Sequence, residues 1–139
     1  MPESALHAEL VQVIVRYAEQ RFGGFANIAV LEDAVRPVRN ERPPRIEGHV
    51  PDVFVTDVPT TVTLIGEAKS QHDLETEHSR RQIAAFLGYL SKTRNGIFVL
   101  SVPLAAGATA SRILSQFRRS FSDSPTQMVV LEGPMAERR

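Results

Sequence analysis

The sequence predicts an α/β fold, in which helices flank a mixed central β-sheet and the elements follow the order α-β-β-β-α-β-α-β. Two β-branched runs, "VPDVFVTDV" and "TTVTLIGEAKS", meet at Pro59 and Thr60, which is typical of antiparallel strands joined by a tight turn. Each later strand-like run is reached through a helical segment, which favours parallel pairing. With 139 residues, 42% of them apolar, the chain suits one domain, expected over residues 1–132, with a flexible tail at 133–139.

The remaining elements follow from the spacing of apolar side chains. Residues 2–22 and 72–92 carry apolar residues at helical spacing, which predicts two helices. The segment "RPVRNERPPRIEGH" at 36–49 is rich in arginine and proline and predicts an irregular surface loop. Strands are expected at 25–35, 50–58, 60–70, 96–102 and 127–132, with a further helix at 108–121.

Composition excludes several classes of protein. The absence of cysteine excludes disulfide frameworks and thiolate metal sites. No run approaches the length of a membrane span, and the acidic start "MPESALHAEL" does not read as a signal peptide, so we expect a cytoplasmic protein with no membrane partner. The formal net charge of zero leaves nucleic-acid binding open, because phosphates can be bound by a local basic patch.

Three charged residues at strand ends stand out. Side chains alternate along a strand, so Glu67 and Lys69 share one face, and folding about the turn at 58–61 brings Asp52 roughly opposite Glu67. Two carboxylates about 4 Å apart repel by roughly 4 kcal/mol, so a positive charge is expected between them. Lys69, one of only two lysines, supplies one charge, and a magnesium (Mg²⁺) or manganese (Mn²⁺) ion would supply two more. The alternative is that these are ordinary solvated charges at strand ends.

Pro51 and Asp52, followed by Glu67, Ala68 and Lys69, resemble the PD-(D/E)xK nuclease superfamily, which has a restriction-endonuclease-like fold. The resemblance extends over about residues 5–132, because the order of elements also agrees, and archaeal junction resolvases and the nuclease domains of recombination exonucleases are the nearest branches. It implies that Asp52, Glu67 and the carbonyl of Ala68 bind the metal and that Lys69 is the catalytic lysine.

The same resemblance implies supporting residues on the helices. Many members add an acid from the first helix, and Glu9 suits this role better than Glu19, because it borders the apolar face. Some branches use a glutamine or tyrosine from the helix that follows the lysine, and Gln82 is the candidate for a catalytic supporting residue. Gln82 belongs to a stripe at helical spacing with Glu75, His78 and Tyr89, and His49 and His72 also border the expected site.

Arginines surround the expected site in the sequence. If they project to the side of Asp52, a neutral chain acquires a basic rim around an acidic centre, as binding to a phosphate backbone requires. The alternative is a solvated loop in which arginines balance Glu41 and Glu47. The residues expected to contact nucleic acid are Arg39, Arg42, Arg45, Arg80 and Arg81.

The function expected from the resemblance is metal-dependent hydrolysis of DNA phosphodiester bonds, directed by the structure of the DNA or by a partner. A homodimer would place two sites for cutting two strands, and a larger nuclease or defence complex is a further expected partner. The alternative is a catalytically silent module of the same fold that binds nucleic acid or serves in assembly.

Overall fold

A five-stranded sheet in the order β1-β2-β3-β4-β5 forms the centre of the protein. The computed structural model describes residues 5–25, 27–33 and 42–133. The β1, β2 and β3 strands pair antiparallel, and β3, β4 and β5 pair parallel, which confirms the predicted mixed sheet. The elements are α1 (Ala5–Arg21), β1 (Ile28–Glu32), β2 (Val53–Asp57), β3 (Thr63–Ala68), α2 (Gln71–Leu74), α3 (Glu77–Leu90), β4 (Gly96–Val102), the 3-10 turn η1 (Leu104–Ala106), α4 (Gly107–Ser120) and β5 (Gln127–Glu132).

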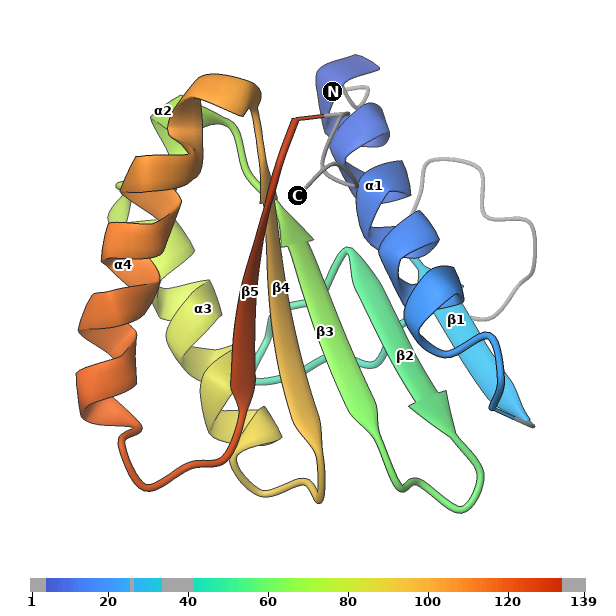
Figure 1. The fold of residues 1–139 in the computed structure, drawn as a ribbon. Helices are drawn as coiled ribbons and strands as arrows, with labels where there is room; N and C mark the ends of the chain where they lie inside the picture. The colour runs from blue at the N-terminus through green and yellow to red at the C-terminus, as the bar shows by residue number, and fades with distance from the viewer. Residues whose placement is uncertain (1–4, 26, 34–41, 134–139) are drawn as a thin grey trace.

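Helices cover both faces of the sheet, as predicted (Figure 1). Helix α1 packs on one face, where Ile14 is fully buried against strand residues such as Val55 and Leu64. Helices α3 and α4 pack on the other face around Phe86 and Phe98. Within the part of the chain that the structure describes, no helix is long and apolar enough to span a bilayer.

The predicted helix at 72–92 is two helices. Ser70 caps α2 by accepting a hydrogen bond from the Asp73 N–H, and Thr76 caps α3 by accepting one from the Ser79 N–H. A hydroxyl side chain at such a position satisfies the free N–H groups of a new helix start. Apolar spacing alone does not reveal this break, because Leu74 and Ile83 are both buried on the same side of the sheet.

Helix α1 approaches strand β3 closely at Gly66. A Cβ atom at Gly66 would lie 2.5 Å from Cγ2 of Ile14, so no larger residue fits there without a shift of the helix. The hydroxyl of Ser101 on β4 donates a hydrogen bond of 2.9 Å to the carbonyl of Leu10 and ties the same helix to the sheet. These two contacts hold the first turns of α1 over the C-terminal end of β3.

Asp57 organises the turn between β2 and β3. Its carboxylate accepts hydrogen bonds from the N–H of Thr61 at 2.7 Å and of Val62 at 2.9 Å, and from the Thr61 hydroxyl at 2.5 Å. These bonds, led by the one from the Thr61 hydroxyl, lower the pKa of Asp57 below its ordinary value. The charged carboxylate, with its hydrogen-bond acceptors occupied, therefore fixes the conformation of this turn. The turn sets the register of β2 on β3.

Candidate active site

The register of β2 on β3 brings Asp52 and Glu67 together. Val53 pairs with Gly66, so the next residues outward, Asp52 and Glu67, meet at the end of the antiparallel ladder. Glu67 pairs in parallel with Leu100 on its other side, so it lies in the middle of the sheet. The sequence-based expectation that these two acids are neighbours is confirmed.

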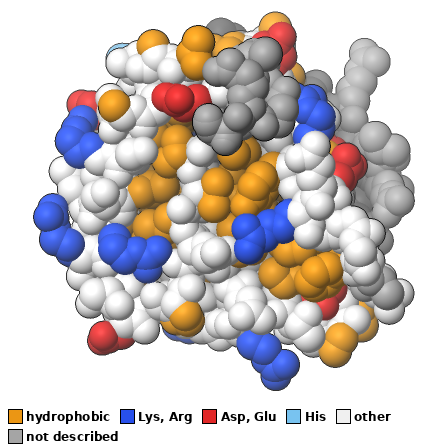
Figure 2. Space-filling model, viewed as in Figure 1, with side chains coloured by type: hydrophobic (Ala, Val, Ile, Leu, Met, Phe, Trp, Pro, Cys, Tyr) orange, Lys and Arg blue, Asp and Glu red, His pale blue; other side chains and the backbone are white. Residues whose placement is uncertain are grey.

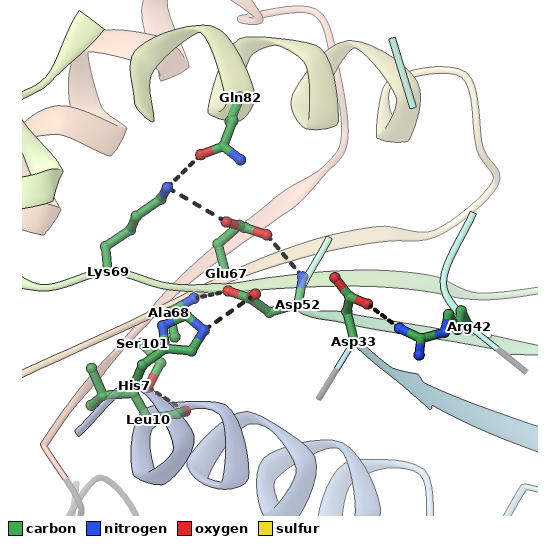
Figure 3. Close-up of polar contacts among 10 residues, drawn as sticks. All are labelled: His7, Leu10, Asp33, Arg42, Asp52, Glu67, Ala68, Lys69, Gln82 and Ser101. Atoms are coloured by element: carbon green, nitrogen blue, oxygen red, sulfur yellow. Dashed lines mark hydrogen bonds and ion pairs between the residues drawn. The ribbon is translucent and has the colours of Figure 1, made fainter. Parts of the chain in front are cut away.

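Each of the two acids is held by a backbone N–H of the neighbouring chain segment. Oε2 of Glu67 accepts a hydrogen bond of 2.9 Å from the Asp52 N–H, and Oδ2 of Asp52 accepts one of 2.9 Å from the Ala68 N–H (Figure 3). One oxygen of each carboxylate thus accepts a hydrogen bond from a rigid backbone donor. The other oxygen of each, Oδ1 of Asp52 and Oε1 of Glu67, faces a basic side chain.

Burial makes this pair electrostatically costly. The Glu67 side chain is 3% exposed and that of Asp52 is 17% exposed. Desolvation of Glu67, with repulsion from Asp52 as the second cause, raises its pKa well above the ordinary value, and the lowering by Lys69 does not offset this. The site therefore favours either a proton on Glu67 or an additional positive charge beside it.

Lys69 and Gln82 complete the buried side of the site. The Lys69 ammonium lies 3.7 Å from Oε1 of Glu67 and donates a short hydrogen bond to Oε1 of Gln82 on helix α3. The backbone N–H of Lys69 donates to the carbonyl of Ser101 at 3.0 Å, which anchors the residue beyond the end of β3. Gln82, predicted as the supporting residue from α3, thus contacts the lysine and fixes the position of its ammonium.

Helix α1 brings His7 to the site, a residue that sequence reasoning did not select. Nε2 of His7 lies 3.4 Å from Oδ1 of Asp52, and its side chain is 30% exposed, so this is the more open side of the cluster. His7 precedes the buried Leu10 by three residues, which places both on the same side of the helix. A histidine in register with the buried face near the helix start was the signal that could have identified it.

Glu9 does not join the acid pair, contrary to the sequence-based expectation. Residues two apart on a helix point about 200° apart, so Glu9 leaves α1 on nearly the opposite side from His7, and its side chain is exposed. Among the described residues, no group of three or more His, Cys, Asp or Glu side chains is placed to hold a metal ion. In the described part of the chain, Asp52 and Glu67 are the acids whose carboxylates meet in the interior of the site.

These two carboxylates fit a hard divalent cation that keeps most of its water. Mg²⁺ is commonly bound through one or two carboxylates, with waters and substrate oxygens as the other ligands, so a third acid is not required. Burial, followed by repulsion from Asp52, raises the pKa of Glu67, and a cation beside the pair would favour its charged form. The predicted role of the Ala68 carbonyl as a further ligand stays a prediction.

The predicted basic rim is only partly in place. Arg42 pairs with Asp33 at 3.0 Å, and the N–H of Asp33 donates to the carbonyl of Asp52, so Arg42 borders the site. Arg45 donates to the carbonyl of Gly48 in the adjacent loop at 3.2 Å. Arg39 lies outside the described residues.

The two arginines of helix α3 contact residues of the helices. Arg80 donates a hydrogen bond of 3.1 Å to Gln116 on helix α4, which corrects the expectation that it faces the site. Its position two residues before Gln82 places it on nearly the opposite side of the helix. Arg81 is exposed and lies 3.7 Å from Glu77, one turn earlier in α3.

The predicted stripe on α3 is interrupted at its start. Glu75 lies in the break between α2 and α3 and pairs with Arg112 on α4 at 2.9 Å. His78 lies one turn before Gln82, and its ring centroid is 5.7 Å from that of His49. Tyr89 is 38% exposed and contacts the ring of Phe54.

Comparison of the chain with family models, with curated proteins and with solved structures finds no match. The assignment of a function therefore depends on the chemistry of the residues that the fold brings together: two braced acids, a lysine held by a glutamine, and a histidine on the open side.

Proposed function

We propose that the protein is a metal-dependent nuclease that hydrolyses DNA phosphodiester bonds. The observation that carries this proposal is the buried pair of Asp52 and Glu67, each fixed by a backbone N–H, with the Lys69 ammonium 3.7 Å from Glu67. A solvated strand-end charge has no need of such bracing. A pair of acids that a fold holds together at electrostatic cost is typical of a site for a cation.

Each residue has a distinct role in this proposal. Asp52 and Glu67 would hold Mg²⁺ or Mn²⁺ through their carboxylates, which backbone N–H groups hold in place. When bound, the ion supplies charge to stabilise the phosphate and lowers the pKa of a coordinated water. Lys69 neutralises charge that develops on the phosphate or orients the attacking water, and Gln82 positions the lysine by accepting its hydrogen bond.

Access to the reacting centre is from the side of His7 and Asp52. Their side chains are 30% and 17% exposed, whereas those of Glu67 and Lys69 are 3% and 10% exposed. A phosphodiester would therefore approach over Asp52, with Arg42 at the border of the site to bind backbone phosphate. The restriction-endonuclease-like fold, and direction by DNA structure or by a partner, belong to the same proposal.

The chain offers a matched control for the test, because its two lysines are Lys69, which is buried, and Lys92, which is exposed. Lys69→Ala and Lys92→Ala are incubated with labelled linear duplex, single-stranded and four-way-junction DNA in Mg²⁺, Mn²⁺ or EDTA. We expect cleavage with metal by the wild type and Lys92→Ala, and a loss of at least about a hundredfold in Lys69→Ala. Equal cleavage by both variants would refute the proposal.

One observation favours a second candidate, a silent module that binds nucleic acid or serves in assembly. The near-complete burial of Glu67, which raises the pKa of its carboxyl, is also compatible with a protonated, neutral Glu67 in a site that binds no metal. This candidate predicts no cleavage by any variant and retention of DNA in a mobility-shift assay that is unchanged by Mg²⁺. Titration calorimetry with Mg²⁺ or Mn²⁺ alone separates the two, because only the nuclease site releases heat on binding that is lost in Glu67→Gln.

A further inference from the structure

Strand β5 presents an open edge. It is the last strand in the sheet order, and within the described residues no strand pairs with its outer side. Soluble proteins usually protect such an edge with a lysine, a proline or a bulge, because unpaired N–H and C=O groups are a template for another strand. The segment "QMVVLE" has none of these protections and carries a single charge, that of Glu132 at its end.

The two sides of β5 are apolar and only partly covered. Val129 packs against the core under α1, and Met128 and Val130 pack against the core under α4, yet all three are half-buried. Figure 2, drawn from the same side as Figure 1, shows the face of the molecule on which α1 lies. Hydrophobic side chains gather in the middle of that face, over the strip of sheet that β5 occupies in Figure 1, with basic side chains around them. An edge with apolar flanks on both sides of the sheet suits another β-strand as its partner.

We propose that β5 pairs antiparallel with β5 of a second copy of this chain, which joins the two sheets into one of ten strands. Such pairing uses a twofold axis perpendicular to the sheet, so the same edge serves both subunits. Residues directly opposite each other must then lie on the same face, and the axis passes at Val129 or at Val130. In either register, apolar side chains of β5 face apolar side chains of its copy.

Charge complementarity selects a second copy as the occupant. Glu132 lies at the C-terminal end of β5 on the side of α4, because a Cβ at Gly107 would collide with its carboxylate. Arg118 of α4 lies at the N-terminal end of the strand and donates to the carbonyls of Ser124 and Thr126 at 3.3 and 2.6 Å. With the axis at Val129, antiparallel pairing places Glu132 of each subunit opposite the partner's Thr126, beside the partner's Arg118, which gives two equivalent contacts between opposite charges.

The absence of native cysteine allows a direct test of the register. Residues directly opposite each other in an antiparallel pair have Cα atoms about 4.5–5.5 Å apart, within the range of about 4.4–6.8 Å that a disulfide needs. A residue two positions from the axis is separated from its own copy by roughly 13 Å along the strands, at about 3.3 Å per residue. Single cysteines at Gln127, Met128, Val129 and Val130 should therefore cross-link with a maximum at one of the last two positions.

Ser111, exposed on helix α4, is the control position for the same reaction. Oxidation is followed on non-reducing gels, and the mass of the full wild-type chain is measured by sedimentation. The result we expect is a dimer and a cross-linking maximum at Val129→Cys or Val130→Cys. A wild type that sediments as a monomer, or cross-linking at Ser111→Cys equal to that along β5, would overturn the proposal.

Charge reversal tests the ion pairs independently of cysteine chemistry. Glu132→Arg and Arg118→Glu should each weaken self-association by about tenfold or more, because each creates two like-charge contacts. An equimolar mixture of the two folded variants should recover association, since both contacts in the mixed dimer regain opposite charges. Failure of the mixture to associate would refute the antiparallel arrangement, and because neither readout involves DNA, the outcome is separate from that of the nuclease proposal.

Discussion

Replacing Glu67 by glutamine should stabilise the metal-free protein at neutral pH, although it removes a residue of the proposed site. Glutamine has the same shape, and its amide oxygen can still accept the hydrogen bond that Oε2 of Glu67 accepts from the Asp52 N–H. What it removes is the charge that burial and Asp52 disfavour. The free energy of unfolding should therefore rise, with a dependence on pH that identifies the cause.

The sign and slope of this dependence follow from proton linkage. Because the pKa of Glu67 is raised in the folded state, the folded wild type holds one proton more than the unfolded chain between the two pKa values. Over that window the wild-type free energy of unfolding falls by about 1.4 kcal/mol for each pH unit of increase, and Glu67→Gln lacks this loss. The advantage of the variant should thus be small near the ordinary glutamate pKa and grow as the pH rises.

Urea unfolding in EDTA, at intervals from about pH 5 to about pH 8, measures this advantage. Glu9→Gln is the matched control, because Glu9 is exposed on α1, and its stability should parallel that of the wild type at each pH. Addition of Mg²⁺ at 100 times its Kd should raise the free energy of unfolding of the wild type by about 2.7 kcal/mol, and that of Glu67→Gln by less. A wild type and Glu67→Gln with parallel curves at every pH would refute the claim that Glu67 is buried at electrostatic cost.

Two further predictions concern the supports of the site. Gly66→Ala should lower the free energy of unfolding by about 1–3 kcal/mol, because the new methyl group would lie 2.5 Å from Cγ2 of Ile14. Urea unfolding should show a smaller loss when the same substitution is made in an Ile14→Ala background. Equal losses in the two backgrounds would contradict the close contact. Asp57→Asn should destabilise the protein near neutral pH but not in acid. Because the pKa of Asp57 is lowered in the folded state, its charge stabilises the fold above the unfolded-state pKa, and this stabilisation is lost as the pH falls through the folded-state pKa. Thermal melts across the acid range measure the difference between the variant and the wild type, and a difference independent of pH would refute the prediction.

The acid pair was predictable from sequence because it depends on local rules. Alternation along strands and a short turn set which residue near the start of β2 lies beside Glu67, and the observed pairing of Val53 with Gly66 places Asp52 there. The contact of Gln82 with Lys69 was likewise predictable from helical spacing once α3 was placed beside the sheet. Helical periodicity resolves the Gln82 contact because α3 has one clearly apolar face.

The contribution of helix α1 was missed, because the apolar face of this helix is broad. Its buried residues cover a wide arc, so spacing places His7 on the buried side but does not by itself show that this side faces Asp52. The rotation of the helix is determined by tertiary contacts, namely the clearance at Gly66 and the hydrogen bond from Ser101 to the Leu10 carbonyl. Those contacts bring His7 to Asp52 and leave Glu9 in solvent.

The two buried acids of this sheet show why Glu67 is a functional candidate and Asp57 is not. Both are nearly inaccessible to solvent, but Asp57 accepts three hydrogen bonds, and the pKa of its carboxyl is lowered. Glu67 accepts one backbone hydrogen bond beside a second acid, and its pKa is raised. A carboxylate with a purely structural role gains stability from its charge, as Asp57 does. The charge of Glu67 lowers stability unless a proton or a cation compensates it, and this is the physical reason for proposing that the site binds a metal ion.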